Sequence, residues 1–485
     1  MIHSFDFASN KFKDTAVVVG VRSSIIHLTG FKSVCVGEVL TSADKIHALV
    51  MSLSDEQVTA VVFSENPVPI GTVMARTGEQ LHVSVGKEIK GSVIDALGYT
   101  ISGNKDLSQD SQPRPVFTSA VPISGRAHIT NFFETGTSLV DLMVPIGAGQ
   151  RELVLGDRGS GKTFFVLRTI VNQAKSGRVV IIALIAKRQA EIKKIISYLK
   201  KAGVFEQCVL VVSQAQSSLG EIYLTPYTAM AVAEHFRDLG EDSLVVLDDL
   251  TNHASFYREL ALLMGEFPGR DSYPGEIFYL HSSLLERGGN FTLQNGKTAS
   301  ITCLPVAESS DGEINGYIQT NLMSMTDGHL FFDQKLFYRG QRPAINVFLS
   351  VTRIGRQTQS ALMRDISNQI MELFQEAEHL QSFSRFGAEI TDRAKNTMLK
   401  VEHLWQFFQQ SQLNSLAFPI QILGLTLAWH GKTSLLSERS LQKFLQNKKF
   451  IKRIENEMQD CQSFANFITK TKSLLSKLEA YAIES

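Results

Sequence analysis

The sequence predicts a multidomain chain in which an N-terminal β-barrel, a central α/β domain and a C-terminal α-helical bundle follow one another. Three successive textures carry this prediction: short apolar runs between turn residues, then apolar strands alternating with helical patterns, then amphipathic helices alone. At 485 residues the chain is also too long for a single hydrophobic core. The predicted boundaries are 1–84 for the barrel, 85–359 for the central domain and 360–485 for the bundle.

The barrel is predicted from short β-rich runs that begin at Thr15. Turn residues separate these runs at intervals of roughly 8–12 residues, and none of them has the period of a helix. The runs are TAVVVGV, SIIHLTG, SVCVGEVL, KIHALVMSL, QVTAVVF and LHVSV. After them, Gly86 to Gly103 is predicted to form a strand with glycine turns, and Ser108 to Pro115 an exposed loop.

The central domain is predicted to contain a parallel sheet. ELVLG is a buried strand that leads into a glycine-rich loop, and TFFVLRTIVNQAKSG has helical period with a glycine stop. VVIIALIA is apolar throughout, as in strands that are covered on both faces. VLVVSQ and SLVVLDDL repeat that pattern around the helical PYTAMAVAEHFRDLG, so strands and helices alternate.

The helical bundle is predicted because strand patterns largely stop after Arg356. Leu362, Ile366, Ile370 and Leu373 lie at helical spacing on one face. Two later stretches are also amphipathic, RAKNTMLKVEHLWQFFQQ and SLQKFLQNKKFIKRIENEMQDCQSFANFITKTKSLLSKLEAYA.

Composition excludes several classes of protein. Lys plus Arg equals Asp plus Glu at 48 each, so no overall charge attracts nucleic acid or anionic lipid. The four cysteines form no C-x-x-C pair, which argues against zinc and redox sites. The longest apolar run, 179–186, is far short of the ~20 residues of a membrane span, and the N-terminus has no apolar signal region. We expect a cytoplasmic chain that meets a membrane only through partners.

The glycine-rich loop GDRGSGKT, Gly156 to Thr163, fits the P-loop pattern G-x-x-x-x-G-K-[ST]. Backbone N–H groups of such a loop converge on phosphate oxygens at the start of a helix. Lys162 is expected to reach the β- and γ-phosphates, and the Thr163 hydroxyl to ligate Mg²⁺. Because a strand precedes the loop and an apolar helix follows it, the sequence predicts nucleotide binding.

Two further positions bear on whether the bound nucleotide is hydrolysed. Asp248 ends the apolar SLVVL run and is expected to hold Mg²⁺, with Asp249 the weaker candidate. Hydrolysis also needs a group that orients or deprotonates the attacking water. VVIIALIA is followed by Lys187 and Arg188, which in their charged form cannot act as bases, and Glu191 lies a turn further on. The residues after VVIIALIA thus include no evident base for hydrolysis.

Arg353 lies in SVTRIG, a loop predicted to follow an apolar strand, INVFLSV. An arginine there could reach the γ-phosphate on a neighbouring subunit, or form an ordinary surface salt bridge. Position alone leaves both readings open.

Many stretches, in order, resemble the α subunits of F-type ATP synthases. The resemblance covers roughly residues 17–418. The matching stretches are TGTSLVDLMVPIGAGQRELVLGDRGSGKT, EHFRDLG, SLVVLDDLTNHASFYREL, PGRDSYPGEIFYLHSSLLERGG, TNLMSMTDGHLFFD, LFYRGQRPAINVFLSVTRIG and FGAEITD.

The resemblance implies a RecA-like central domain in a hexamer where α alternates with β subunits around a central γ stalk. It implies proton-coupled ATP synthesis or hydrolysis at β sites, and Mg-ATP or Mg-ADP bound to α without turnover. It places the complex on the cytoplasmic side of the cell membrane, as a peripheral part, with no nucleic acid bound.

The resemblance also implies roles for particular residues. Arg353 would act in trans as an arginine finger at the β site, with Ser350 close to it. Thr163 and Asp248 would ligate the metal. The nucleotide-binding positions would be Gly156, Asp157, Arg158, Gly159, Ser160, Gly161, Lys162, Thr163 and Phe164 around the phosphates, and Arg342, Pro343, Gln410 and Gln412 around the adenine.

Three departures from the family pattern leave alternatives open. Gly159 and Lys187 each replace a family glutamine, and the expected N-terminal helix that docks on the peripheral stalk has no clear counterpart. An α-like subunit of a related rotary-type ATPase that does not make ATP is one alternative. A catalytic homohexameric ATPase of the export type is the other, and it would need a carboxylate near Lys187.

Overall fold

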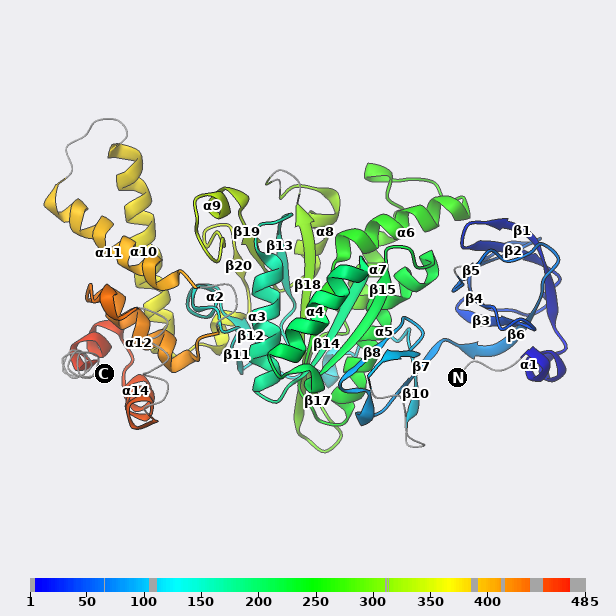
Figure 1. Cartoon of the computed structure of the whole chain (residues 1–485), viewed down its shortest axis with the longest axis horizontal. Coiled ribbons are helices and arrows are strands. Elements are labelled where there is room, and N and C mark those ends of the chain that lie inside the picture. The colour runs from blue at the N-terminus through cyan, green and yellow to red at the C-terminus, as the bar shows by residue number, and fades with distance from the viewer. Residues whose placement is uncertain are drawn as a thin grey trace. The chain divides into compact units, whose positions relative to one another are not determined.

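The computed structural model describes residues 5–64, 66–103, 111–309, 312, 314–384, 391–410, 415–436 and 448–471. These residues form two compact units. The first comprises Met1–His128, Gly149–Leu155 and Gln173–Asp327, and the second Ile129–Ala148, Gly156–Asn172 and Gly328–Ser485. Figure 1 shows a barrel, a sheet flanked by helices, and a group of C-terminal helices, which confirms the predicted fold class.

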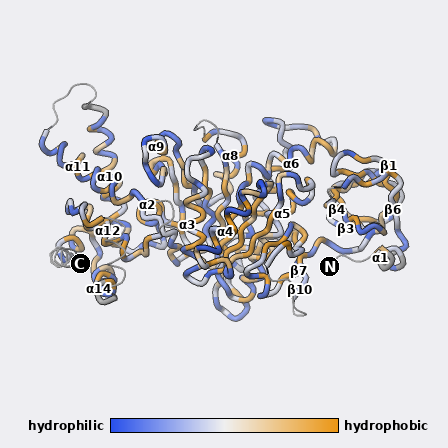
Figure 2. The backbone as a smooth tube through the Cα atoms, in the orientation of Figure 1, coloured by the Kyte–Doolittle hydropathy of each residue, from blue (hydrophilic) through white to orange (hydrophobic). Residues whose placement is uncertain are grey.

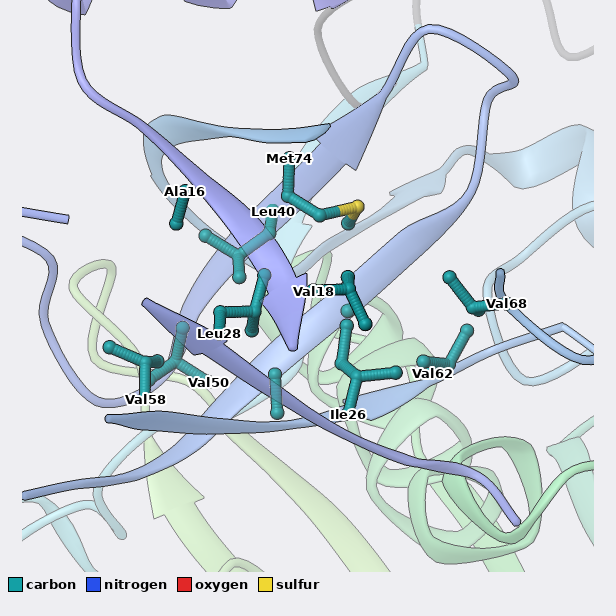
Figure 3. Packing of buried hydrophobic residues seen from close by; sticks show 12 residues of the cluster. Ala16, Val18, Ile26, Leu28, Leu40, Val50, Val58, Val62, Val68 and Met74 are labelled. Carbon is teal, nitrogen blue, oxygen red and sulfur yellow. The ribbon is translucent and has the colours of Figure 1, made fainter. Parts of the chain in front are cut away.

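The N-terminal part of the first unit is a closed six-stranded barrel in the order β1-β2-β5-β4-β3-β6. Alternate residues of each strand point inward and pack one apolar core, which includes Ile26, Leu28 and Met74 (Figure 3). A short helix, α1 (Phe5–Phe12), packs against β6. The barrel strands are β1 (Thr15–Arg22), β2 (Ile25–Thr29), β3 (Glu38–Ser42), β4 (His47–Leu53), β5 (Val58–Val62) and β6 (Val73–Gln80).

One predicted barrel run belongs elsewhere. LHVSV forms β7 (His82–Val85), which pairs with β10 (Gln112–Pro115) in a separate two-stranded sheet. The barrel closes instead through β6, whose VMARTGEQ sequence lacks strong β alternation. The predicted loop at 108–115 was therefore wrong over its second half, because prolines are compatible with an edge strand; residues 108–110 lie outside the described residues.

The main sheet of the first unit has the strand order β13-β18-β16-β14-β15-β8-β9. Its central pairs are parallel, as the apolar runs predict, and hydrophobic residues are concentrated along these strands (Figure 2). The hairpin of β8 and β9 confirms the strand with glycine turns, and β17 pairs with β18. The strands are β8 (Ser92–Ile94), β9 (Thr100–Ser102), β13 (Glu152–Asp157), β14 (Val179–Lys187), β15 (Cys208–Gln214), β16 (Ser243–Asp248), β17 (Gly289–Thr292) and β18 (Thr298–Ser309).

Helices pack against this sheet and connect its strands. The long α5 contacts β14, β15 and β16, and its buried side chains match the apolar PYTAMAVAEHF pattern. The Ser218 hydroxyl caps α5 by accepting from the Glu221 N–H at 3.2 Å. The helices are α4 (Gln189–Lys201), α5 (Leu219–Asp238), α6 (Leu250–Met264), α7 (Ile277–Leu285) and α8 (Tyr317–Met325).

The second unit contains most of α3 and the C-terminal helices. An apolar cluster that includes Ile420, Leu427 and Ile454 joins α12 to α14, and the Phe374 and Trp405 rings stack at 4.9 Å between α10 and α11. The described residues beyond β20 contain no strand. The elements are β11 (Phe132–Phe133), α2 (Ser138–Met143), β12 (Ile146–Gly147), α3 (Lys162–Lys175), β19 (Gly328–Phe332), α9 (Gln334–Tyr338), β20 (Val351–Thr352), α10 (Ala361–Ser384), α11 (Asp392–Phe408), α12 (Phe418–Trp429) and α14 (Lys448–Asp460).

INVFLSV is not the strand that its apolar residues predict. Apart from a bridge at Ile345, only its last residue, Val351, is in a strand. The Asn346 side chain accepts hydrogen bonds from the N–H groups of Phe348 and Leu349, at 3.1 and 3.2 Å, and folds the chain into a turn. No helix among the described residues is long and apolar enough to span a membrane.

Candidate nucleotide-binding site

The P-loop lies between the end of β13 and the start of α3 in the second unit. Gly159 and Gly161 have φ angles of 79° and 101°, the left-handed region that glycine enters without strain. The Ser160 N–H and hydroxyl both donate to the Asp157 carbonyl, at 3.2 and 2.7 Å. The loop is thus a compact turn whose shape depends on its glycines.

Lys162 begins α3 and is buried. Its ammonium donates to the carbonyls of Gly156 and Asp157, at 2.5 and 2.8 Å, so its charge is held over the loop itself. Thr163 and Phe164 are exposed on the first helical turn, and Arg158 is exposed on the loop. A helix N-terminus with a lysine at its first position can bind a phosphate group. The metal-binding role of Thr163 stays a prediction.

The residues predicted to surround the adenine lie close together in the same unit. The Gln410 N–H donates to the Arg342 carbonyl at 3.0 Å, and a cis peptide joins Arg342 to Pro343. The Gln410 side chain accepts from the Ser138 N–H at 2.8 Å and donates to the Gly136 carbonyl at 3.2 Å. Its amide is therefore already engaged by Gly136, in the loop before α2, and by Ser138, the first residue of α2. Gln412 lies outside the described residues.

Phe337 is a residue that sequence reasoning missed. The Arg342 guanidinium lies 3.5 Å from the centre of the Phe337 ring and donates to the Phe337 carbonyl at 2.6 Å. The ring also faces the P-loop, because a Cβ on Gly161 would lie 3.8 Å from it. The only hint in the sequence was that the stretch LFYRGQRP contains two aromatic residues. Only the tertiary structure indicates which of them faces the loop.

In the first unit, Lys187 at the end of β14 forms ion pairs with Asp248, the last residue of β16, and with Asp249, which follows it. Its ammonium lies 2.8 Å from Asp248 Oδ1 and 3.2 Å from Asp249 Oδ2. Burial lowers the pKa of Lys187, but the charges of the two carboxylates and the hydrogen bonds to them outweigh burial, so the net pKa is raised. Lys187 is therefore a cation, and the strand β14 itself ends without a base. The carboxylates beside it, Asp248 and Asp249, both belong to the next strand end and both contact its ammonium.

The two aspartates fit the predicted magnesium site poorly. Mg²⁺ takes oxygen ligands in near-ideal octahedral geometry. Asp248 instead accepts from an ammonium, and Asp249 caps α6 by accepting from the Asn252 N–H at 2.7 Å and from its side-chain amide at 3.0 Å. A metal ion at Asp248 would therefore lie beside the Lys187 ammonium, whose like charge repels it.

Arg353 is exposed directly after β20, on a loop that is anchored on both sides. Thr352 Oγ1 donates to the Pro145 carbonyl at 2.9 Å and accepts from the Gly355 N–H at 3.1 Å. Ser350 does not lie at the surface of this loop as a free hydroxyl: its Oγ donates to the Asn346 carbonyl at 2.7 Å and accepts from the Phe331 N–H at 3.0 Å. Ser350 thus joins the Arg353 loop to β19.

A strand, a glycine-rich loop and a lysine at the first position of a helix define a P-loop nucleotide-binding protein. The family model of the ATP synthase alpha/beta family, nucleotide-binding domain, matches residues 136–352. That range contains the P-loop, Lys187, Asp248 and Arg342.

Three similar proteins are α subunits of ATP synthases. An ATP synthase subunit alpha of Ehrlichia ruminantium is 34% identical, over 98% of this chain and 96% of the relative. The one from Caldanaerobacter subterraneus is 33% identical, over 100% and 95%. The one from Clostridium acetobutylicum is 35% identical, over 85% and 81%. The chain belongs to the family of ATP synthase α subunits.

Proposed function

We propose that this chain is the nucleotide-binding, non-catalytic α subunit of an F-type ATP synthase or ATPase. One observation carries the non-catalytic part: β14 ends in Lys187, whose ammonium is held by Asp248 and Asp249. A protonated lysine cannot accept a proton from an attacking water. The relatives' name supports the membership of an ATP synthase complex.

The nucleotide would be ATP or ADP, held mainly by the second unit. The loop N–H groups and Lys162 would bind its phosphates, with Arg158, Thr163 and Phe164 exposed beside them. The base would lie toward Arg342, Pro343 and Gln410, where the Gln410 N–H donates to the Arg342 carbonyl. From the sequence resemblance, Gln412 is also proposed to contact the adenine.

The partners would be β subunits that alternate with this chain in a hexamer, and a central γ subunit. Arg353 would reach the β site in trans, with Ser350 supporting its loop. The complex would couple ATP chemistry to proton movement, and it would lie peripherally on the cytoplasmic side of the cell membrane. Two observations support the finger: Arg353 is exposed, and its loop is anchored through Thr352.

Of the two alternatives, only the catalytic homohexamer predicts a different result for the isolated chain. A catalytic homohexamer of the export type would hydrolyse ATP without β subunits. An α-like subunit of a rotary-type ATPase that does not make ATP would bind without turnover and differ only in its complex.

The test is to purify the full chain and measure ATP binding and ATP hydrolysis in parallel. We expect binding with negligible turnover. Lys162→Ala should weaken binding by about 100-fold or more, because a charge-assisted contact to phosphate is lost. Lys175→Ala, an exposed lysine in the last turn of the same helix, is the matched control and should bind normally. Steady hydrolysis by the lone chain would favour the export-type alternative.

A further inference from the structure

We propose that Lys187 takes the place of a divalent cation, so that this chain binds ATP about equally well with and without Mg²⁺. The proposal rests on the proposed function, nucleotide binding at the P-loop, and adds to it a loss of the metal requirement. It starts from Asp248, the carboxylate that the sequence predicts as the protein's acidic metal ligand.

The ammonium of Lys187 already contacts the Asp248 carboxylate. It lies 2.8 Å from Asp248 Oδ1 and 3.2 Å from Asp249 Oδ2, so it bridges the two carboxylates. The side chains are largely removed from water: 16% of Lys187, 18% of Asp248 and 3% of Asp249 remain exposed. A close ion pair in such a place is much stronger than one at the surface.

A magnesium ion would compete poorly for Asp248. It would have to lose tightly held water and bind beside an ammonium of like charge, or else displace that ammonium. Displacement would leave Lys187 as a buried charge without its main partner, which is strongly unfavourable. Asp249 offers little help, because both of its oxygens already accept hydrogen bonds from Asn252.

The backbone holds Lys187 in this position. The register in which β14 pairs with β15 shifts between Leu184 and Lys187, and Ala186, which lies between these residues, has a φ angle of 52°. A left-handed alanine is strained and persists only where its surroundings hold it. They do so here: the Ala186 N–H donates to Ser213 Oγ at 3.1 Å, and the Lys187 carbonyl accepts from the Ala215 N–H at 3.1 Å.

The test compares ATP binding to the full chain in excess MgCl₂ and in excess EDTA by isothermal titration calorimetry. For the wild type we expect dissociation constants that agree within about threefold. Lys187→Gln removes the ammonium from Asp248, and we expect binding about tenfold weaker in EDTA than in Mg²⁺. Lys187→Arg keeps a cation and should behave like the wild type. Lys194→Gln, an exposed lysine on α4, is the matched control.

The wild type alone can overturn the proposal, even if Lys187→Gln fails to fold. Tight binding in Mg²⁺ that is lost in EDTA would overturn it and leave the proposed function intact. Absence of ATP binding in both buffers would overturn the proposed function, and this inference with it. A Lys187→Gln variant as independent of Mg²⁺ as the wild type would also overturn it, because the lysine would then not be the cause.

Discussion

At the scale of single residues, two acids of the second unit, Glu134 and Asp141, have raised pKa values. Burial, and then the charge of Asp141, raise the pKa of Glu134 to about 7. Burial raises the pKa of Asp141 to about 6, although it accepts hydrogen bonds from Gln421, Thr135 and Gly136. Glu134 also accepts from the Phe418 N–H at 2.9 Å, so it joins the loop before α2 to α12.

The raised pKa of Glu134 gives a pH dependence of stability. The folded chain favours the protonated acid, so its stabilising effect is full below the ordinary pKa of 4.5 and is lost as pH rises through about 7. Glu134→Gln stays neutral and can still accept from Phe418. We therefore expect the variant to melt about 2 °C above the wild type at pH 8, a gain of about 1 kcal/mol, and to equal it near pH 4.5.

The measurement is thermal unfolding across this pH range. Glu402→Gln, an exposed position on α11, is the control and should leave the pH profile unchanged. A Glu134→Gln variant that loses stability equally at all pH values would contradict the role of the charge.

At the scale of elements, the short strand β20 and the loop after it hold Arg353 in place. This arrangement needs Gly355, because the backbone at that residue lies directly against the Pro145 carbonyl. A Cβ at Gly355 would overlap that oxygen and lie 2.6 Å from Thr352 Oγ1. The position therefore has no room for a side chain.

Gly355→Ala should force this loop away from Pro145. We expect a loss of about 1–3 kcal/mol, as for other overpacked sites, seen as a lower melting temperature. In the assembled complex, ATP turnover should fall as well, because Arg353 moves. Gly275→Ala is the control, since a Cβ there meets nothing within 4 Å. Unchanged melting of Gly355→Ala would show that the loop adapts.

At the scale of the whole molecule, nucleotide binding and the finger are proposed to serve different sites. The P-loop of this chain would bind its own nucleotide, whereas Arg353 would act on a partner's. The two activities should then be separable by mutation.

Arg353→Ala in the assembled hexamer tests this separation. We expect ATP binding to the isolated chain to stay normal, while turnover by the complex falls by ~10³ or more, as for other arginine fingers. Arg356→Ala, an exposed arginine three residues on, is the control. Normal turnover in the Arg353 variant would leave only the surface salt-bridge reading.

Local pattern was enough to predict the order of the three parts, the strand and helix around the P-loop, and the family. It failed at Asn346, where a side chain that caps its own backbone outweighs an apolar run. It failed again at LHVSV, because the strand that closes a barrel is selected by pairing with a distant strand.

By itself, the sequence determined that this chain has a phosphate-binding loop and no carboxylate at the end of β14. Both features can be recognised from residue types at short spacing in the sequence, because they depend only on neighbouring residues. Only the tertiary structure decided what Lys187 does instead. Its partners lie 61 and 62 residues away, and the parallel register of β14 and β16 brings the two strand ends together. Contacts over that separation depend on how the sheet assembles, which no local pattern encodes.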